Sequence, residues 1–340
     1  MAKRRIAKRW ILLTALAVVA AAAGIWLVDG TQPVDTKDQG HKVTLRFETS
    51  TRLPAVLTQL QKRGVVRDAL ATRILSLIER RPSIVHSGSY AFNTSMSAEQ
   101  VLRSLRNPVT LLIRLPETNW ANRTAHLLQN YEVVDADDYM DLVHNPQTFA
   151  NDVSFPLPKD SLEGYLYPKR YSLPPLYGAR RVILQQLKEF EKNVWNTDDR
   201  PKDLARTLTI ASLVQLEAGT DHDRPMIAGV IENRIKKKMY LQIDSTILYG
   251  IQKWRRLYFK DYHAIKSPYN TYINKGLPPG PICSPDAKDI QAAMHPAKHN
   301  YVYYVALPNG RTIYAATYKE HLKNIAIRKA AIKALKGVKS

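Results

Sequence analysis

An uncharged run of 19 residues, from Trp10 to Val28, constrains this chain more than any other feature of its sequence. A helix rises about 1.5 Å per residue, so the run would be about 28 Å long, close to the ~30 Å hydrocarbon core of a bilayer. Residues 1–9 hold five basic side chains before the run, and none follows it directly. The positive-inside rule therefore predicts a cytoplasmic basic tail at 1–9, a single-pass membrane helix at 10–28, and export of the rest.

A cleaved signal peptide is the alternative interpretation, because Ala20 to Ala23 supply the small residues that precede a cleavage site. The apolar run is longer than that of a usual signal peptide, and it continues through Ile25, Trp26 and Leu27. We therefore expect an uncleaved anchor in the cell (inner) membrane. Both interpretations place the following residues in a periplasm or another extracytoplasmic space.

The chain is strongly basic, with 50 Lys and Arg against 30 Asp and Glu, a formal net charge of +20. This excess suits an anionic partner such as nucleic acid, an acidic membrane surface or an acidic wall polymer, and charge does not choose among them. Cys283 is the single cysteine, which excludes an intrachain disulfide, and the sequence contains no Cys/His cluster with zinc-ligand spacing. We expect neither a metal ion nor a cofactor.

The exported part divides by composition and periodicity. Residues 29–41 are polar, with Gly, Pro and Asp, and predict a linker. Residues 42–108 predict a small α+β module. A strand-like alternation ends at Phe47, helical patterns cover 53–64 and 67–80, a turn at 87–90 leads into a second strand, and Ser97 begins a helix that Asn107-Pro108 stops.

Residues 109–340 predict a second, mostly helical domain, so the fold class of the whole chain is α+β. A strand is expected at 110–115 and a helix at 122–129, followed by a short helix and a long loop within 135–174. Further helices are expected at 179–194, 202–218, 223–238 and 285–294. Pro308-Asn309-Gly310 predicts the turn of a β-hairpin, and a last helix is expected at 318–335.

One carboxylate stands out on the predicted helix at 202–218. Ile210, Leu213, Val214 and Glu217 have the spacing of a single helix face, so Glu217 extends an apolar stripe next to a predicted C-cap, Gly219. Partial burial and the negative end of a helix both favour a protonated carboxyl group, the form that a general acid needs. The plainer alternative is a glutamate at the edge of the stripe that reaches solvent or pairs with an arginine.

Polar and aromatic residues gather downstream of this helix. Gln242, Asp244 and Ser245 alternate with apolar residues, and Ser267-Pro-Tyr269-Asn270-Thr271-Tyr272 is followed by a stiff, proline-rich loop. Amides and hydroxyls beside flat rings are typical of a carbohydrate cleft. The alternative is a surface loop built from turn residues.

Several motifs, in this order along the chain, resemble the YceG-like (MltG) family of endolytic murein transglycosylases over nearly its whole length. They are Glu163-Gly-Tyr-Leu-Tyr-Pro168, Ala211-Ser-Leu-Val-Gln-Leu-Glu217-Ala218, Ala228-Gly-Val-Ile-Glu-Asn233-Arg234, Leu241-Gln-Ile-Asp244-Ser-Thr-Ile-Leu-Tyr249-Gly250, Ser267-Pro-Tyr269-Asn270-Thr271-Tyr272, Gly276-Leu-Pro-Pro-Gly-Pro281, Ala292-Ala-Met-His295-Pro296-Ala297 and Glu320-His321.

The resemblance implies a lyase that acts on peptidoglycan glycan strands, with Glu217 as the catalytic residue, peptidoglycan synthases as partners, and no nucleic acid. It also implies a LysM-like subdomain at 42–108 and a YceG-like catalytic domain at 109–340. Substrate contacts are expected from Gln242, Asp244, Ser245, Tyr269, Asn270, Thr271 and Tyr272, and Glu163 either lines the cleft or braces a loop.

The chain departs from the family pattern at four positions. Gln215 replaces the first glutamate of an E-x-E pair, so Glu217 alone keeps the catalytic position. Lys169 and Asp286 replace an acidic residue and a glycine, and Thr118 replaces a glycine.

A lytic transglycosylase needs only one carboxylate, because the sugar's own C6 hydroxyl attacks in place of water. Hydrolytic glycosidases generally use two. A hydrolase that pairs Glu217 with Asp244 or Glu163 therefore stays open, as does a scaffold protein that binds the wall without cutting it.

Overall fold

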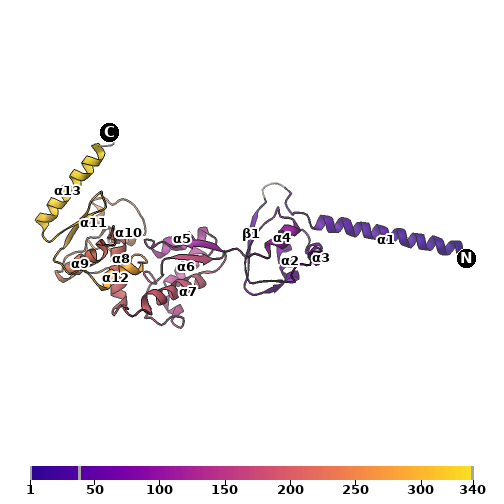
Figure 1. Ribbon diagram of the computed structural model, residues 1–340, viewed down its shortest axis with the longest axis horizontal. Coiled ribbons are helices and arrows are strands. Elements are labelled where there is room, and N and C mark those ends of the chain that lie inside the picture. The colour runs from indigo at the N-terminus through magenta and orange to yellow at the C-terminus, as the bar shows by residue number, and fades with distance from the viewer. Residues whose placement is uncertain (1, 37–39, 338–340) are drawn as a thin grey trace. The chain divides into compact units, whose positions relative to one another are not determined.

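The computed structural model describes residues 2–36 and 40–337. It contains two compact units, of which the first comprises Met1–Leu112 and Ser172–Tyr177, and the second comprises Ile113–Tyr171 and Gly178–Ser340. Each unit combines helices with short strands that form two-stranded sheets (Figure 1). The mixed helix-and-sheet character predicted from the sequence is confirmed.

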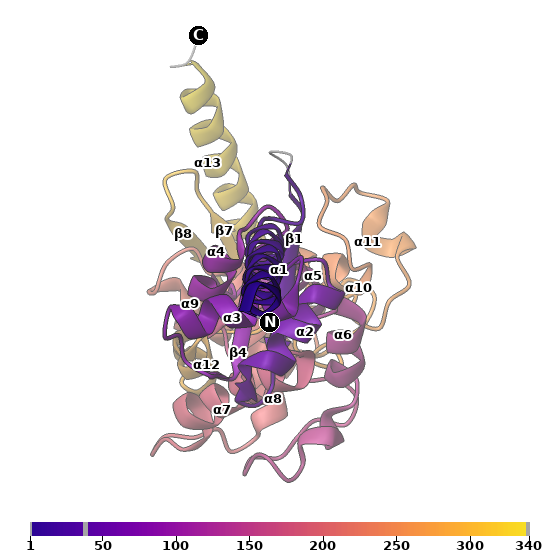
Figure 2. The same ribbon diagram turned by 90° about the vertical axis from the view of Figure 1, so that its right-hand side faces the viewer.

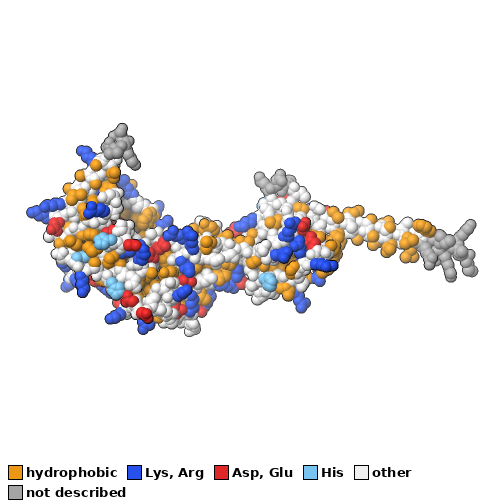
Figure 3. All heavy atoms as spheres, in the orientation of Figure 1, with side chains coloured by type: hydrophobic (Ala, Val, Ile, Leu, Met, Phe, Trp, Pro, Cys, Tyr) orange, Lys and Arg blue, Asp and Glu red, His pale blue; other side chains and the backbone are white. Residues whose placement is uncertain are grey.

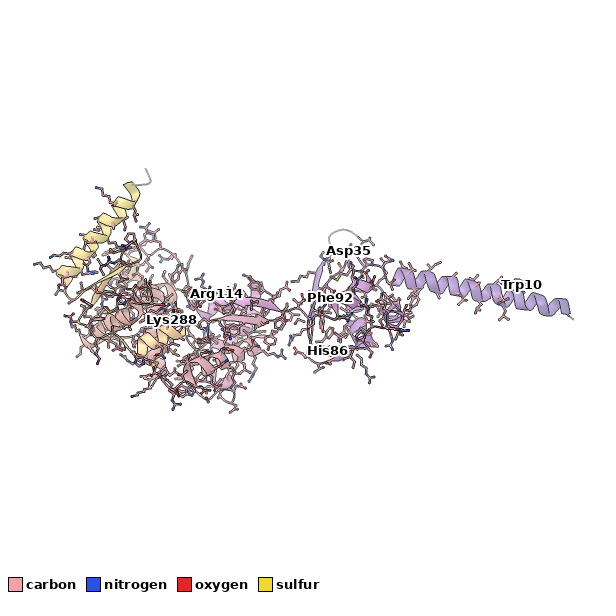
Figure 4. All side chains as sticks on the ribbon, viewed as in Figure 1. Trp10, Asp35, His86, Phe92, Arg114 and Lys288 are labelled. Atoms are coloured by element: carbon pink, nitrogen blue, oxygen red, sulfur yellow. The ribbon has the colours of Figure 1, made fainter. Side chains whose placement is uncertain are left out.

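The predicted membrane helix is one continuous helix, α1 (Ala2–Gly30). Its segment Trp10–Gly30 has the length and apolar composition to cross a membrane, and nearly all of it is exposed, with only its end at Gly30 buried. Figure 3 shows hydrophobic atoms along this helix, and Figure 4 shows Trp10 on it. The side chains of the basic tail, residues 1–9, lie outside the described part. The linker predicted at 29–41 begins two residues later in the structure, because residues 29–30 continue α1. Residues 37–39 of the predicted linker lie outside the described part.

After α1, the first unit places two helices between two pairs of strands and ends in a further helix. Strand β1 (Lys42–Phe47) is followed by β2 (Thr51–Arg52), α2 (Leu53–Lys62), α3 (Ala69–Ile78), β3 (Ile84–Val85), β4 (Gly88–Asn93) and α4 (Ala98–Ser104). β1 and β4 pair antiparallel, with Lys42 opposite Asn93 and Phe47 opposite Gly88, and β2 pairs with β3.

Local sequence signals explain where these elements begin. Pro54 occupies the first turn of α2, Asp68 accepts two backbone N–H groups at the start of α3, and Ser97 forms a capping box with Gln100 at the start of α4. The core of the unit is a cluster of buried apolar side chains that includes Phe92, which is labelled in Figure 4.

Two paired strands, each of which the division between the units crosses, precede and follow the first helices of the second unit along the chain. β5 (Leu111–Arg114) pairs with β6 (Arg170–Leu173), and between them lie α5 (Ala121–Asn130), α6 (Ala136–Val143) and the 3₁₀ turn η1 (Pro146–Phe149). α7 (Ala179–Phe190) runs on into one π-helical turn, η2 (Glu191–Trp195). The weakly periodic region 135–174 therefore holds a strand, β6, in addition to the predicted short helix.

The rest of the second unit is built around α8 (Leu204–Glu217), which packs against α9 (Asp223–Lys236) and α12 (Ala287–Met294). Two short helices, α10 (Asp244–Gly250) and α11 (Asp261–Ala264), lie in segments for which the sequence analysis predicts no helix. The predicted hairpin is present as β7 (Tyr303–Ala306) and β8 (Thr312–Ala315), with Val305 opposite Ile313. The last helix, α13 (Tyr318–Gly337), extends outward from this hairpin in Figures 1 and 2.

Candidate active site

Glu217 is the last residue of α8, a helix buried on nearly every side. The stripe residues Ile210, Leu213 and Val214 are fully covered, whereas Glu217 is partly buried. The helix ends at Ala218, which has an extended backbone (φ −78°, ψ 124°) and donates its N–H to the Val214 carbonyl. The prediction that Gly219 caps this helix is wrong, because the extended backbone of Ala218 ends it one residue earlier.

Both carboxylate oxygens of Glu217 accept hydrogen bonds from hydroxyl groups. The Tyr304 hydroxyl on β7 donates to Oε2 at 2.9 Å, and the Ser245 hydroxyl on α10 donates to Oε1 at 3.3 Å. Burial raises the pKa of Glu217 to about 7; the Tyr304 hydrogen bond lowers it, the negative charge of Asp244 raises it and the Ser245 hydrogen bond lowers it. The carboxyl group can thus exist in both protonation states near neutral pH.

Asp244 is the exposed first residue of α10, next to Ser245. The Tyr272 hydroxyl donates to its Oδ1 at 2.6 Å. The Tyr272 ring stacks on the Tyr262 ring, with centroids 4.5 Å apart and planes 27° apart. Asp244 is therefore a fixed negative charge near Glu217, and it is open to solvent.

Asn270 and Thr271 are buried inside the protein. The Asn270 amide donates to the carbonyls of Tyr262 at 3.0 Å and Ile265 at 2.8 Å. The Thr271 hydroxyl accepts from the Ile243 N–H at 3.0 Å, and the Thr271 carbonyl accepts from the Gln242 N–H at 3.2 Å. Both residues hold in place the backbone that carries Tyr272 and Asp244.

Gln242 and Tyr269 have different surroundings. The Gln242 side chain is exposed, and its backbone lies in the left-handed region with a φ of 53°. Such a conformation is uncommon outside glycine and is often found near functional sites. The Tyr269 ring packs against the Tyr249 ring with centroids 4.7 Å apart, and it is partly buried.

Glu163 lies in a separate buried environment. Its Oε2 accepts the Ala121 N–H, the first of helix α5, at 2.9 Å, and the Glu163 side chain interacts with Tyr249. Burial raises the pKa of Glu163 to about 7, against the lowering effect of its hydrogen bonds. This geometry fastens the start of α5.

Two residues that the sequence analysis did not select complete the site. Tyr304 reaches Glu217 from a strand 87 positions along the chain. Arg234 on α9 is buried and donates from Nε to the Val302 carbonyl and from Nη1 to the Leu241 carbonyl, each at 2.6 Å. Arg234 thereby ties β7, which carries Tyr304, to the segment that leads into Asp244. The aromatic run at 301–304 and the Asn233-Arg234 motif were the available signals.

Three of the departures from the family pattern make specific contacts. The Gln215 side-chain oxygen accepts the Asp286 N–H at 3.3 Å, and Asp286 caps α12 by accepting the N–H groups of Lys288 and Asp289. Lys169 forms an ion pair with Glu189 at 3.0 Å. Gln215 and Asp286 thus support each other, and each departure is accommodated locally.

The part of the chain described by the structure brings together no group of three His, Cys, Asp or Glu side chains that could hold a metal ion. Cys283 is a free, fully buried thiol, and its sulfur lies 3.4 Å from the Ser212 carbonyl of α8. Burial raises the pKa of this thiol well above its ordinary value.

Over residues 2–36 and 40–337, fold and site together define a mixed helix-and-sheet protein with one membrane-length apolar helix. Its site is centred on the Glu217 carboxylate, which accepts hydrogen bonds from two hydroxyl groups. A family model described as the YceG-like family matches residues 45–327, and this chain belongs to that family.

The relatives share much of its length. The endolytic murein transglycosylase of Bacillus subtilis strain 168 is 31% identical over 312 residues, which are 86% of each chain. That of Streptococcus pneumoniae serotype 2 strain D39 is 28% identical over 337 residues, covering 88% of this chain and 61% of the relative. The crystal structure of a protein from Listeria monocytogenes described as yceG-like superposes with a TM-score of 0.55 at 28% identity, covering 84% of this chain and 99% of the other.

Proposed function

We propose that this chain is an endolytic murein transglycosylase that cuts peptidoglycan between MurNAc and GlcNAc without water and leaves 1,6-anhydroMurNAc ends. It would act in wall assembly by terminating glycan strands. The family match and the relatives named endolytic murein transglycosylase support this assignment. The observation that carries it is the Glu217 carboxyl group, held by Tyr304 and Ser245 with a pKa raised to about 7.

In the first step Glu217 acts as general acid. It gives its proton to the glycosidic oxygen as the bond from that oxygen to the anomeric carbon of MurNAc breaks. The anomeric carbon gains positive charge, and the leaving sugar departs with its hydroxyl restored. Positioned acid catalysis of this kind contributes about 10²–10⁴-fold to the rate.

In the second step the Glu217 carboxylate acts as base. It takes the proton of the MurNAc C6 hydroxyl as that oxygen bonds to the anomeric carbon, which closes the anhydro ring and restores the protonated enzyme. The nucleophile belongs to the same sugar, so no second reactant has to be brought in. The hydroxyl donors Tyr304 and Ser245 stabilise the carboxylate between the two steps.

The surrounding residues receive roles that follow from their exposure. Asp244, exposed and held by Tyr272, faces the developing positive charge, and Gln242 and Tyr269 contact the glycan. Buried Asn270 and Thr271 position this wall of the site. Glu163 braces α5.

A hydrolase that uses Asp244 as its second carboxylate is the competing function that a specific observation favours. Asp244 lies close enough for its charge to raise the pKa of Glu217. Buried Glu163, bound to the Ala121 N–H, is a weaker partner for Glu217. A wall-binding scaffold without activity leaves the paired hydroxyls on Glu217 unexplained.

Mass spectrometry of purified peptidoglycan after digestion separates the three functions. The lyase produces 1,6-anhydromuramyl ends and no new reducing muramyl ends. Reducing ends would assign a hydrolase, and no new ends of either kind would assign a scaffold.

We also propose that the first unit's module at 42–108 is LysM-like and positions the enzyme on glycan without doing chemistry. The placement of two helices between two pairs of strands and the antiparallel β1–β4 pair support this. A cavity of about 190 Å³ lies in the same unit and is lined by Leu53, Arg81, Pro82, Ile84, Val85, His86, Leu102, Leu105 and Arg106. His86, one of these lining residues, is labelled in Figure 4. The apolar lining residues of the cavity together with Arg81 and Arg106 suit a sugar that carries acidic groups.

The same proposal includes the topology. α1 anchors the chain in the cell membrane as a single-pass helix with the N-terminus in the cytoplasm, and the residues after α1 lie outside the cytoplasm, where peptidoglycan and its synthases are found.

A further inference from the structure

Helix α3 in the first unit packs on the core through Ala69 and Leu75, and it also presents large apolar residues to solvent. The residues that it buries are Ala71, Thr72 and Ser76. Three of its large apolar side chains point outward, with Leu70 59% exposed and Leu77 and Ile78 each 66% exposed, whereas Ile74 and Leu75 are partly buried. Leu70 and Leu77 are seven residues apart and thus share one helix face. Water is an unfavourable environment for such a face.

This exposed face, here called the α3 stripe (Leu70, Leu77 and Ile78), belongs to a helix that packs on the end of α1. The Trp26 indole N–H on α1 donates to the carboxylate of Asp68, which caps α3, at 3.1 Å. Arg67 and Asp29 form an ion pair at 2.8 Å. A side chain at Gly30 would begin 2.7 Å from the Ala71 Cβ, so the two helices touch at a glycine.

The position of Trp26 relates α3 to the depth of a bilayer. Tryptophans concentrate at the two membrane–water interfaces. Trp10 and Trp26 lie near the two ends of the apolar segment, roughly 24 Å apart along a helix. Asp68, bound to Trp26, therefore lies at the interface where α1 leaves the bilayer. Figure 2, which looks along α1, shows α3 beside it on the near face of the unit.

The charges on and after α3 also suit this location. Arg73 is exposed on α3, and exposed Arg80 follows its end. Basic side chains beside an exposed apolar stripe are typical of helices that lie in a membrane interface, where they meet anionic lipid headgroups.

We propose that the α3 stripe docks on the membrane leaflet from which α1 emerges. The rest of the first unit then contacts the bilayer through α3 and is not attached to it through α1 alone. The proposal rests on the proposed insertion of α1. The occupant of the stripe is the lipid itself: Leu70, Leu77 and Ile78 enter the headgroup–acyl boundary, and Arg73 and Arg80 contact lipid phosphates.

The test uses the full chain reconstituted, one copy per nanodisc, in phosphatidylglycerol and phosphatidylethanolamine. A fluorophore is attached to variants that each carry one added cysteine, Leu77→Cys or Ile78→Cys. The native Cys283 is fully buried and stays unlabelled. Lipids with a nitroxide near the headgroup quench a fluorophore at the interface, and lipids with a nitroxide on the acyl chain quench a fluorophore inside the bilayer, such as one at residue 16. Leu16→Cys, on the exposed surface of α1, reports insertion of the anchor.

Ser50→Cys is the matched control in the same unit. Ser50 is exposed just after β1, whose end residue Phe47 pairs with Gly88. Gly88 lies against Pro108, four residues before this segment of the first unit ends at Leu112.

We expect lipid quenching at Leu77 and Ile78 to exceed that at Ser50 by at least about twofold. Quenching equal to that at Ser50, with strong quenching at Leu16, would overturn the docking and leave the anchor standing. A fluorophore at Leu77 that is shielded from water but not quenched by lipid would assign the stripe to a protein partner, and this too would overturn the proposal. Without quenching at Leu16, both the anchor and the docking fail.

Discussion

The Glu217 carboxyl group is under opposing influences from two neighbours. The Tyr304 hydroxyl stabilises its charged form, whereas the negative charge of Asp244 stabilises its neutral form. In a mechanism that begins with a proton donated by Glu217, activity falls as pH rises through the pKa of this group. The two neighbours should therefore shift the alkaline limb of the pH–rate profile in opposite directions.

Tyr304→Phe removes the hydroxyl donor and should move that limb upward from about pH 7, because the pKa of Glu217 rises. Asp244→Asn removes the negative charge and should move the limb downward. Tyr303→Phe is the control on the same strand, since the Tyr303 ring stacks on His321 with centroids 4.7 Å apart. Profiles of kcat/KM that shift in the same direction for both variants would contradict this account of the site.

Glu163 couples the stability of the protein to pH. Burial raises its pKa from 4.5 to about 7, so between these values the folded state keeps a proton that the unfolded chain has lost. The contribution of protonated Glu163 to the free energy of unfolding is complete below about pH 4.5 and is lost as pH rises through 7.

Glu163→Gln removes this ionisation and keeps an acceptor for the Ala121 N–H. Relative to wild type, the variant should gain about 2–3 kcal/mol between pH 5 and pH 8.5, as each pKa unit corresponds to about 1.4 kcal/mol. Urea denaturation across this range measures the difference. Glu320→Gln is the contrast, because backbone N–H groups of Ala316 and Thr317 hold the pKa of Glu320 below its ordinary value, and its stabilising effect lies at higher pH. Equal pH dependence in wild type and Glu163→Gln would contradict the buried proton.

Single residues were predictable from the sequence where the signal was local. Glu217 was selected from the spacing of one helix and its motif. Tyr304 was not, because its contact with Glu217 depends on how a distant hairpin folds back onto α8. Asn270 and Thr271 show a different limit: hydrogen-bonding side chains between prolines suit a sugar cleft or an internal brace equally well, and only the fold reveals that these two are buried.

At the scale of elements, the helices with a clear period or cap and the hairpin were predicted, whereas the short helices α10 and α11 were not. The Asn309-Gly310 turn signal gave the β7–β8 hairpin directly. α10, with seven residues, begins after a run that alternates as a strand does, and its hydrogen bonds to the Thr271 segment hold it in place. The pairing of β5 with β6 brings together residues about sixty positions apart, which no local pattern encodes.

The module of the first unit yields a prediction of its own. Arg106→Ala removes a basic side chain from the rim of the 190 Å³ cavity and should weaken co-sedimentation with peptidoglycan about three- to tenfold, as expected for one charged contact. Cutting at saturating substrate should stay near wild type, because the chemistry belongs to the second unit. Arg103→Ala is the control: this exposed side chain at the end of α4, three residues before Arg106, pairs with Glu99. Equal binding by both variants would argue against glycan recognition at this cavity.

For the whole molecule, the anchor and the position of the units outside the cytoplasm can be tested directly. A reporter that is active only outside the cytoplasm, fused after residue 340, should be active, and the protein should sediment with membranes. The physical reason is the 21-residue apolar helix behind a basic N-terminal segment. A soluble product that begins near Gly24 would show a cleaved signal peptide instead, and an inactive reporter would reverse the topology.

The central claim is that Glu217 moves the protons of an anhydro-forming cleavage. The most direct test is the rate at which Glu217→Gln forms 1,6-anhydromuramyl ends from purified peptidoglycan, measured by mass spectrometry beside wild type. Glutamine keeps the size of the side chain and can still accept from Tyr304, so the variant should fold with wild-type stability. We predict that the rate falls by at least about 100-fold, the loss expected when a general acid is removed. A folded Glu217→Gln protein that forms anhydro ends at near the wild-type rate would contradict the account.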